Sequence, residues 1–351
     1  MRARLILAAF GIAAALGAAG PLRADDISIV GSSTVYPFMR LVADEFSKTS
    51  AAAITIEATG TETGFDYFCA GMADFLPDMN NASFAITRQQ RRTCNRNGVR
   101  DIVAFLIGYD GLVVFTDAAS PLTDIGRLDL YRAIAAETPA AGALRPNDVS
   151  VWAGVNDALP GLPIRVLGPP QTSGTRLYIE DGLLKPSCYE LLGRLGRDVP
   201  RETELRCMKV RGDGAYVDVS EDDQFLIGAV GGAPGAIGLV GYGQFQLAGP
   251  AVKALTVDGV APNFANIETQ RYPLSRPLFV YVKRARLMRN PDMAAFLRLL
   301  LSDKVSGRGG ALSRLGLVPP SDEITAQNRR TLDEGLEFEC PSVFCAETAG
   351  N

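Results

Sequence analysis

Three short segments combine serine, threonine and glycine in a way that suits the binding of an anion. They are Ser32-Ser-Thr34, Thr59-Gly-Thr61 with Thr63-Gly64, and Thr172-Ser-Gly-Thr175. A helix that begins at such a segment offers hydroxyl donors and free backbone N–H groups at the positive end of its dipole. Each segment alone is typical of a helix cap, but three of them in one chain favour a site for an oxyanion.

Two arginines are candidates for adding positive charge to that site. Arg88 comes just after a predicted strand, and Arg176 lies at the start of the helix predicted after the third segment. A planar guanidinium can hold two oxygens of a tetrahedral oxyanion through parallel hydrogen bonds. The alternative for each is a solvated surface arginine.

The composition of the 351-residue chain excludes several classes of enzyme and of metal site. Histidine is absent, which removes Ser-His-Asp and Cys-His catalysis and histidine-ligated metals. The sequence has no Walker loop, no GxGxxG, no GxSxG elbow and no CxxC pair. We therefore expect no catalytic residue, no metal and no cofactor. The formal net charge is −4, whereas nucleic-acid binders usually carry a basic surplus, so nucleic acid is not an expected partner.

Residues 1–24 have the pattern of a secretory signal peptide. Arg2 and Arg4 precede an apolar run from Leu5 to Gly20, and small residues precede the acidic pair Asp25-Asp26. The alternative is a membrane anchor, but an apolar run of about 16 residues is short for a hydrocarbon core of ~30 Å. No cysteine lies near the predicted cleavage point, so a lipoprotein is not indicated. We expect an exported protein that is located in the periplasm.

All six cysteines follow the predicted leader. An even number of cysteines in an exported chain favours disulfides over metal thiolates. The sequence leaves every pairing open, and the sequential one is preferred because it closes three local loops. It joins Cys69 to Cys94, Cys188 to Cys207, and Cys340 to Cys345.

Beyond Asp26 the chain alternates between short apolar runs, polar turns and stretches with helical spacing. Strands are predicted at 27–30, 53–57, 83–86 and 164–167. The third of these strands is predicted to end at Thr87 and Arg88. This order is typical of an α/β fold, in which the functional loops lie at the carboxyl ends of parallel strands.

In these segments the sequence resembles the periplasmic phosphate-binding protein of Pst-type ABC transporters, which has the type II periplasmic-binding-protein fold. The resemblance covers most of the mature chain, from about Ile27 to Pro320. The matching pieces, in family order, are Gly31-Ser-Ser-Thr-Val-Tyr-Pro37, Gly60-Thr-Glu-Thr-Gly-Phe65, Phe68-Cys-Ala-Gly71, Cys94 with Asn97-Gly98, Tyr109-Asp110, Ser173-Gly-Thr175, Ser220-Glu-Asp-Asp223, Gly235-Ala-Ile-Gly238 and Pro273-Leu-Ser-Arg-Pro-Leu-Phe279.

The resemblance implies an α/β protein of two lobes, joined by crossover strands, with a ligand cleft between the lobes. The crossover strands are expected at Leu112–Phe115 and Leu278–Val282. The expected organisation is therefore a signal peptide at 1–24, a first lobe made of 25–109 plus 270–351, and a second lobe made of 110–269.

The resemblance also implies a set of ligand-binding residues. In that family the anion is held by hydroxyls and amides of the first two segments, by a serine-arginine dipeptide at the third strand, and by the far-lobe serine-glycine-threonine loop. The positions implied here are Ser33, Thr34, Thr61, Thr63, Thr87, Arg88, Ser173, Gly174 and Thr175.

Two departures from the family pattern concern the ligand. Glu62 and Thr63 interrupt a run of glycines in the second segment. A carboxylate aimed at phosphate repels it, unless the carboxylate accepts a ligand proton or pairs with Arg88. The serine-arginine-proline signature of the family has become Thr87-Arg88-Gln89.

The leading hypothesis is a non-enzymatic, monomeric receptor that captures phosphate between its lobes and presents it to an ABC permease. A second hypothesis within the binding class is another oxyanion or a phosphorylated small molecule, prompted by Glu62. A secreted phosphatase or other hydrolase is a third, although the chain lacks histidine. A structural or adhesive exported protein would not bring the three segments together in a cleft.

Overall fold

The structure is a computed structural model that describes residues 26–194, 199–233 and 235–334. The leader predicted at 1–24 and the predicted Cys340–Cys345 disulfide lie outside these ranges. Within these ranges, no helix is both long enough and apolar enough to cross a membrane.

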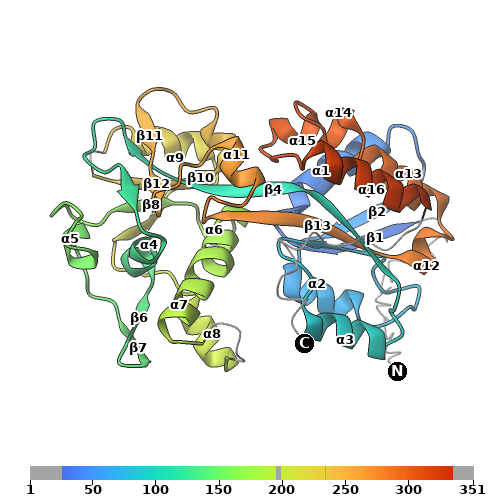
Figure 1. The fold of residues 1–351 in the computed structure, drawn as a ribbon, viewed down its shortest axis with the longest axis horizontal. Coiled ribbons are helices and arrows are strands. Elements are labelled where there is room, and N and C mark those ends of the chain that lie inside the picture. Colours follow the sequence, from blue (N-terminus) through green and yellow to red (C-terminus); the bar gives the residue numbers. More distant parts are fainter. Residues whose placement is uncertain (1–25, 195–198, 234, 335–351) are drawn as a thin grey trace, which may run out of the picture.

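Strands from distant parts of the chain join in one mixed sheet, which curls through the whole molecule (Figure 1). In sheet order the strands are β2 (Ile54–Glu57), β1 (Ile27–Gly31), β3 (Met79–Ala82), β13 (Ser275–Lys283), β4 (Ile102–Asp117), β10 (Ile237–Gly241), β8 (Val166–Gly168) and β9 (Tyr216–Asp218), and β11 (Val252–Ala254) also pairs with β4. Two small sheets pair β5 (Asp124–Ile125) with β12 (Thr256–Val257), and β6 (Glu137–Ala140) with β7 (Ala143–Pro146). Pairing is parallel around β1 and around β8, which confirms the predicted α/β class.

Two antiparallel strands, β4 and β13, run between the two halves of the molecule (Figure 1). The first part of β4 pairs with β13, and its last part pairs with β10 and β11. The crossover strand that was expected at Leu112–Phe115 is part of this one continuous strand of 16 residues. We call the half around β1–β3 the first lobe and the half around β8–β10 the second lobe. The lobe boundaries near residues 109 and 270 stay a prediction.

Helices follow most of the strands and cover both faces of the sheet (Figure 1). They are α1 (Tyr36–Phe46), α2 (Thr61–Phe68), α3 (Arg88–Arg96), α4 (Arg127–Ile134), α5 (Trp152–Val155), α6 (Gly174–Tyr178), the π-helix η1 (Ile179–Leu184), α7 (Lys185–Leu191), α8 (Arg201–Cys207), α9 (Asp223–Val230), α10 (Tyr242–Phe245), α11 (Phe264–Glu268), α12 (Arg284–Leu287), α13 (Pro291–Leu300), α14 (Asp303–Ser306), α15 (Ala311–Arg314) and α16 (Asp322–Glu334).

Apolar side chains fix α1 and α2 on opposite faces of the first-lobe sheet. On one face α1 packs with α13 and α16, and Phe46 of α1 meets Phe296 of α13 edge to face, with ring centroids 5.6 Å apart. On the other face Phe65 and Phe68 of α2 belong to a second core cluster, which extends into the second lobe. Burial of such side chains is worth about 1.5–3 kcal/mol each, so the positions of the two helix starts are set by the core.

Two of the predicted disulfides are confirmed. Cys69, directly after α2, is bonded to Cys94 of α3. Cys188 of α7 is bonded to Cys207 of α8. Each bond ties two short helices together, which alone would be marginal in water.

The third strand lies four residues earlier than predicted. β3 consists of Met79-Asn-Asn-Ala82, and all four residues are buried. The prediction of 83–86 followed the apolar residues, but the two asparagines occupy interior positions and break the alternation that marks a strand. The first residue after the strand is therefore Ser83, and Thr87 and Arg88 belong to the next helix.

A buried lysine at the end of β13 gives the fold a pH dependence. Lys283 is fully buried, its Nζ donates a hydrogen bond of 2.7 Å to the carbonyl oxygen of Gly71, and it lies 5.2 Å from the ring centroid of Phe68. Burial and the nearby Arg286 lower the pKa of Lys283 to about 8. The unfolded chain thus binds more protons than the folded chain above that pH.

We therefore expect Lys283 to contribute about 1–2 kcal/mol more to the free energy of unfolding at pH 9.5 than at pH 8. Buried tyrosines, whose pKa values are raised in the folded state, act in the opposite direction as the tyrosines of the unfolded chain begin to ionise. The measurement is therefore urea unfolding of wild type and Lys283→Met at pH steps across that window, and wild type should gain about that amount relative to the variant. A stability difference between the two proteins that does not change with pH would contradict the assignment.

Candidate functional site

The first segment forms the turn between β1 and α1. The Oγ of Ser32 accepts hydrogen bonds from the backbone N–H groups of Thr34 (3.2 Å) and Val35 (3.4 Å). Ser33 and Thr34 are half-buried, and no described residue bonds to their hydroxyls. Val35 precedes α1 without a side-chain cap. The turn before α1 therefore keeps the hydroxyls of Ser33 and Thr34 as donors that no part of the described chain uses, whereas the N–H groups of Thr34, Val35 and Tyr36 already have acceptors.

The second segment packs its backbone against the first. The N–H of Gly60 donates to the carbonyl oxygen of Gly31 at 2.9 Å. Gly60 has φ +82°, which glycine adopts without strain. A Cβ at Gly64, one turn into α2, would lie only 2.6 Å from the Cα of Gly31. The start of α2 is thus held directly beside the end of β1.

The end of β3 joins the same place through Thr61. Thr61 is buried, its hydroxyl accepts a hydrogen bond from the N–H of Ser83 (3.1 Å), and its Oγ1 lies 3.2 Å from the Oγ of Ser83. Ser83 was missed by the sequence analysis, because the end of the third strand was placed four residues too late. The sequence marks Ser83 only by its position directly after the Asn80-Asn-Ala82 run.

The third segment reaches across from the second lobe. Ser173 caps α6, and its Oγ accepts a hydrogen bond of 3.2 Å from the N–H of Thr175. A Cβ at Gly174 would lie 3.3 Å from the carbonyl oxygen of Ser33 and 3.9 Å from the Cα of Thr34. The structure thus brings together six of the predicted residues, which are Ser33, Thr34, Thr61, Ser173, Gly174 and Thr175.

Three predicted residues are not joined to this place by any described contact. Thr63 is exposed on α2. Thr87 is exposed and caps α3, accepting from the N–H of Gln90 (3.2 Å) while its own N–H donates to Oε1 of Gln90 (2.9 Å). Arg88 is the first residue of α3 and has no hydrogen-bond or ion-pair partner in the described ranges.

The second arginine candidate, Arg176, is a structural residue. Its Nε donates to Glu180 at 2.8 Å and its Nη1 donates to Asp218 at 2.7 Å. The guanidinium also lies 4.8 Å from the ring centroid of Tyr216. These contacts fix α6 to β9, and they leave little of the guanidinium for a ligand.

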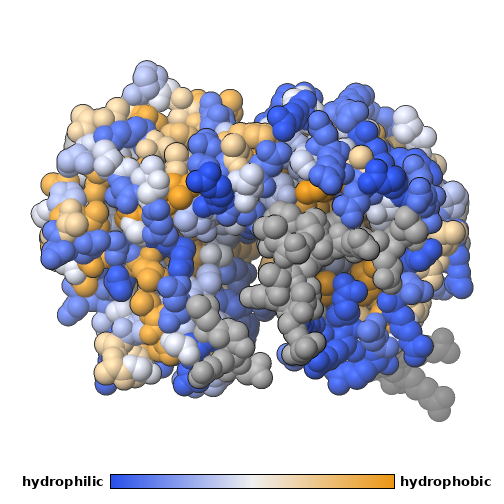
Figure 2. Space-filling view, viewed as in Figure 1, coloured by the Kyte–Doolittle hydropathy of each residue, from blue (hydrophilic) through white to orange (hydrophobic). Residues whose placement is uncertain are grey.

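Glu62 forms an ion pair that joins the two lobes. Its Oε1 lies 2.9 Å from Nζ of Lys185, the first residue of α7. The same ammonium lies 3.8 Å from carboxylates of Asp181 and Glu204. Glu62, Lys185 and Glu204 line a cavity of about 540 Å³ between α2–α3 and α7–α8, where the molecule is hollowed in Figure 2. The carboxylate that departed from the family pattern is therefore engaged with Lys185, not Arg88.

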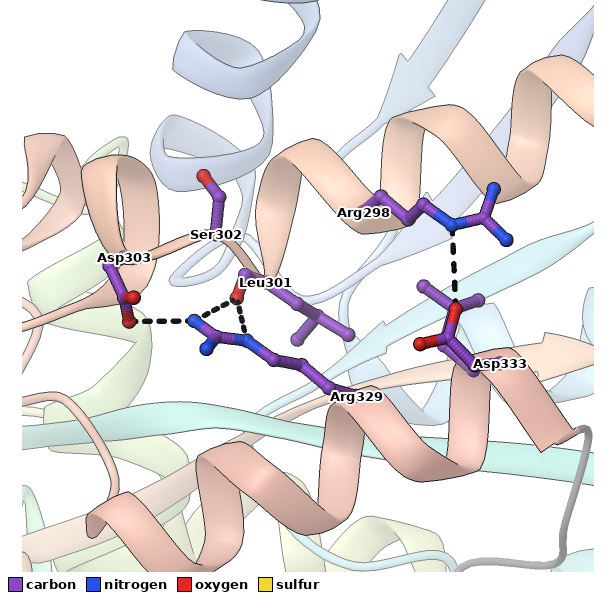
Figure 3. Close-up of a pocket in the computed structure, with 7 residues that line it drawn as sticks. Arg298, Leu301, Ser302, Asp303, Arg329 and Asp333 are labelled. Atoms are coloured by element: carbon purple, nitrogen blue, oxygen red, sulfur yellow. Dashed lines mark hydrogen bonds and ion pairs between the residues drawn. The ribbon is translucent and has the colours of Figure 1, made fainter.

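A separate surface cavity of about 330 Å³ lies between α13 and α16 (Figure 3). Arg329 bonds the carbonyl oxygen of Leu301 and lies 2.6 Å from Asp303. Arg298 lies 3.5 Å from Asp333. Both arginines are neutralised by an aspartate, so this cavity offers no free positive charge to an anion.

Comparisons with known proteins concern the family and the fold of the chain. A family model described as a PBP superfamily domain matches residues 16–304. Protein SphX of Synechococcus elongatus is 28% identical over 309 residues, which cover 86% of this chain and 79% of that protein. The phosphate-binding protein PstS of Staphylococcus aureus is 24% identical over 280 residues, covering 78% and 73%.

Solved structures of phosphate-binding proteins are also similar to this chain. The structure described as "a possible phosphate binding protein from Planctomyces limnophilus" has a TM-score of 0.69 at 27% identity, and covers 89% of this chain and 99% of that one. An ABC-type phosphate transport receptor from Vibrio cholerae has a TM-score of 0.59 at 19% identity, covers 84% and 100%, and supports the fold alone. Since the family model covers most of the sequence and the fold agrees with it, the chain belongs to the PBP superfamily.

Proposed function

We propose that the protein is a periplasmic receptor that binds phosphate between its lobes and presents it to an ABC permease. The observation that carries the proposal is the contact of Gly174 with Ser33, because it places the start of a second-lobe helix against the start of a first-lobe helix. The proposed ligand groups are Ser33, Thr34, Thr61, Ser83, Ser173, Gly174 and Thr175. The relatives named as phosphate-binding proteins support phosphate as the ligand.

The mechanism follows from where the donors lie. The first lobe supplies the starts of α1 and α2 and the Ser83 hydroxyl, and the second lobe supplies the start of α6. Closing the lobes removes water, and hydrogen bonds to the anion strengthen in the lower local dielectric. The Glu62–Lys185 ion pair adds a contact across the closed cleft. The protein is proposed to bind and release its ligand unchanged, without catalysis.

Calorimetric titration of the purified protein tests this function. We expect one phosphate per chain, arsenate binding in competition with it, and sulfate binding much more weakly. A phosphonate with an organic substituent tests the second hypothesis, because the cavity beside Glu62 and Lys185 has room for a substituent. Tighter binding of the phosphonate than of phosphate would replace the proposed ligand. No binding of any of the four would overturn the function.

Ser83 and Arg88 distinguish the set of ligand residues proposed here from the set that the resemblance implied. Ser83→Ala removes a hydroxyl that lies beside Thr61, so phosphate affinity should fall by about tenfold, the effect of losing one hydrogen bond to a charged group. Arg88→Ala should change it less than threefold, because no described contact joins Arg88 to the loops. Calorimetry of both variants checks this. A larger loss for Arg88→Ala than for Ser83→Ala would restore the site predicted from the sequence.

A further inference from the structure

The proposed anion site has hydroxyl and N–H donors, and the cation that is bonded to its segments in the described ranges, Lys185, is paired with Glu62. No described hydrogen bond or ion pair joins Arg88 to the loops, and Arg176 is engaged with Glu180 and Asp218. An oxyanion of charge −1 to −2 is bound more tightly when a cation lies nearby in a region of low dielectric. A buried cation within about 10 Å of the site therefore has electrostatic influence on the ligand even without touching it.

Arg276 is such a cation. It lies on β13, is 8% exposed, and its Nη2 and Nε lie 2.9 Å and 3.2 Å from Oδ2 of Asp110 on β4. Its guanidinium stacks on Tyr178, with Cζ 3.6 Å from the ring centroid. Tyr178 is the last residue of α6 and Gly174 is the first. Four residues of helix rise about 6 Å, so Arg276 lies on the order of 10 Å from the Gly174–Ser33 contact.

Two carboxylates act on this arginine. Asp110 pairs with it directly. Burial raises the pKa of Asp181 on η1, and Lys185 and Arg276 oppose that rise. Beyond Asp110, burial together with Asp222 and Asp110 raises the pKa of Asp223, at the start of α9, to about 6. Arg276 is thus the cation paired with Asp110, beside the helix that reaches the anion site.

This inference rests on the proposed function. We propose that Arg276, which acts on the ligand without touching it, supplies the favourable electrostatic potential of the anion site, and that Asp110 weakens that potential. The charge of Asp110 opposes the bound anion, while that of Arg276 favours it. At about 10 Å and an effective dielectric of about 20, one unit charge changes the affinity for an anion by about tenfold. The charge of Asp110 therefore keeps the phosphate affinity below the value that the same loops would give without that charge.

The two partners of one ion pair then have opposite effects when neutralised. Asp110→Asn removes the opposing charge and leaves Arg276 stacked on Tyr178, so phosphate affinity should rise about tenfold. Arg276→Met leaves the carboxylates uncompensated, so affinity should fall at least tenfold. Arg276→Lys keeps the charge and should stay within about threefold of wild type. If the pair only holds β4 to β13, Asp110→Asn lowers the affinity or leaves it unchanged.

The experiment is calorimetric titration of wild type and variants with inorganic phosphate, together with thermal melts of each protein. The matched control is Asp213→Asn, which removes one negative charge from the ion pair of another buried arginine, Arg211. Asp213 precedes β9, at the strand end opposite to Asp218 and α6, so its neutralisation should leave affinity within twofold.

The outcomes separate the two proposals. Wild type that binds no oxyanion overturns the proposed function, and this inference with it. Wild type that binds phosphate, with Asp110→Asn unchanged or weaker, overturns this inference alone. A rise in Asp110→Asn that Asp213→Asn does not share supports it, and the result stands even if Arg276→Met does not fold.

Discussion

Gly64→Ala is expected to abolish phosphate binding at any concentration that a titration reaches, with a loss of affinity of more than 100-fold. A Cβ at this position would lie 2.1 Å from Oδ1 of Asn80 and 2.6 Å from the Cα of Gly31. Gly31 is backbone of a buried strand and cannot move aside, so α2 has to shift. The shift carries away the hydroxyl and the N–H of Thr61. Two hydrogen bonds to a charged ligand are together worth about 3–6 kcal/mol.

The side-chain amide of Asn80 makes it harder for the core to relax around an alanine at position 64. Asn80 is fully buried, and neither its Nδ2 nor its Oδ1 has a hydrogen-bond partner among the residues that the structure describes. It occupies the space between Gly31 and Gly64, where only glycines fit against it. Overpacking a core costs about 1–3 kcal/mol or more, so the thermal midpoint of Gly64→Ala should fall as well.

The control for this variant is Gly228→Ala. Gly228 lies inside α9, and a Cβ there would meet no atom within 4 Å. Alanine in a helix interior is favoured over glycine by roughly 0.5–1 kcal/mol, so stability should rise slightly and phosphate binding should not change. Phosphate affinity within tenfold of wild type in Gly64→Ala would show that α2 does not hold the ligand.

The parts of the site that could be predicted from the sequence are those whose signal is local. Each of the three segments puts serine, threonine and glycine between an apolar run and a helical stretch, and the N-cap role of Ser173 follows from that pattern alone. The α/β class follows from the same alternation. The two confirmed disulfides close short loops, of 25 and 19 residues in sequence separation, so the sequential pairing found them.

The parts that could not be predicted depend on contacts between distant residues. β3 is an interior strand whose buried asparagines hide its periodicity, so its end was predicted four residues too late, at Thr87 and Arg88, and Ser83 was not among the predicted residues. The partner of Glu62 lies 123 residues away in the second lobe. Arg276 was part of a matched motif, but its stacking on Tyr178 appears only when β13 is placed against α6. Nothing in the local pattern distinguishes such residues from solvated ones.

Removing the Cys69–Cys94 disulfide is expected to have the second largest effect. In the chain-entropy account, a cross-link that closes a loop of about this length stabilises the folded state by about 3 kcal/mol. Cys69→Ser with Cys94→Ser should therefore lower the free energy of unfolding by about that amount. The bond also fixes the end of α2, and a helix of eight residues is too short to stay formed without tertiary support. Phosphate affinity should fall together with stability.

The Cys188–Cys207 bond is the matched comparison, because it closes a loop of similar length in the second lobe. Its double serine variant should lose a similar free energy of unfolding, since the entropy term changes only slowly with loop length. It ties α7 to α8, which carry none of the proposed ligand hydroxyls, so phosphate affinity should change less than threefold. Urea unfolding and calorimetry of both variants measure the two quantities separately. An equal loss of affinity in both variants would mean that the disulfides act on the fold as a whole, and that α2 has no special place in the binding site.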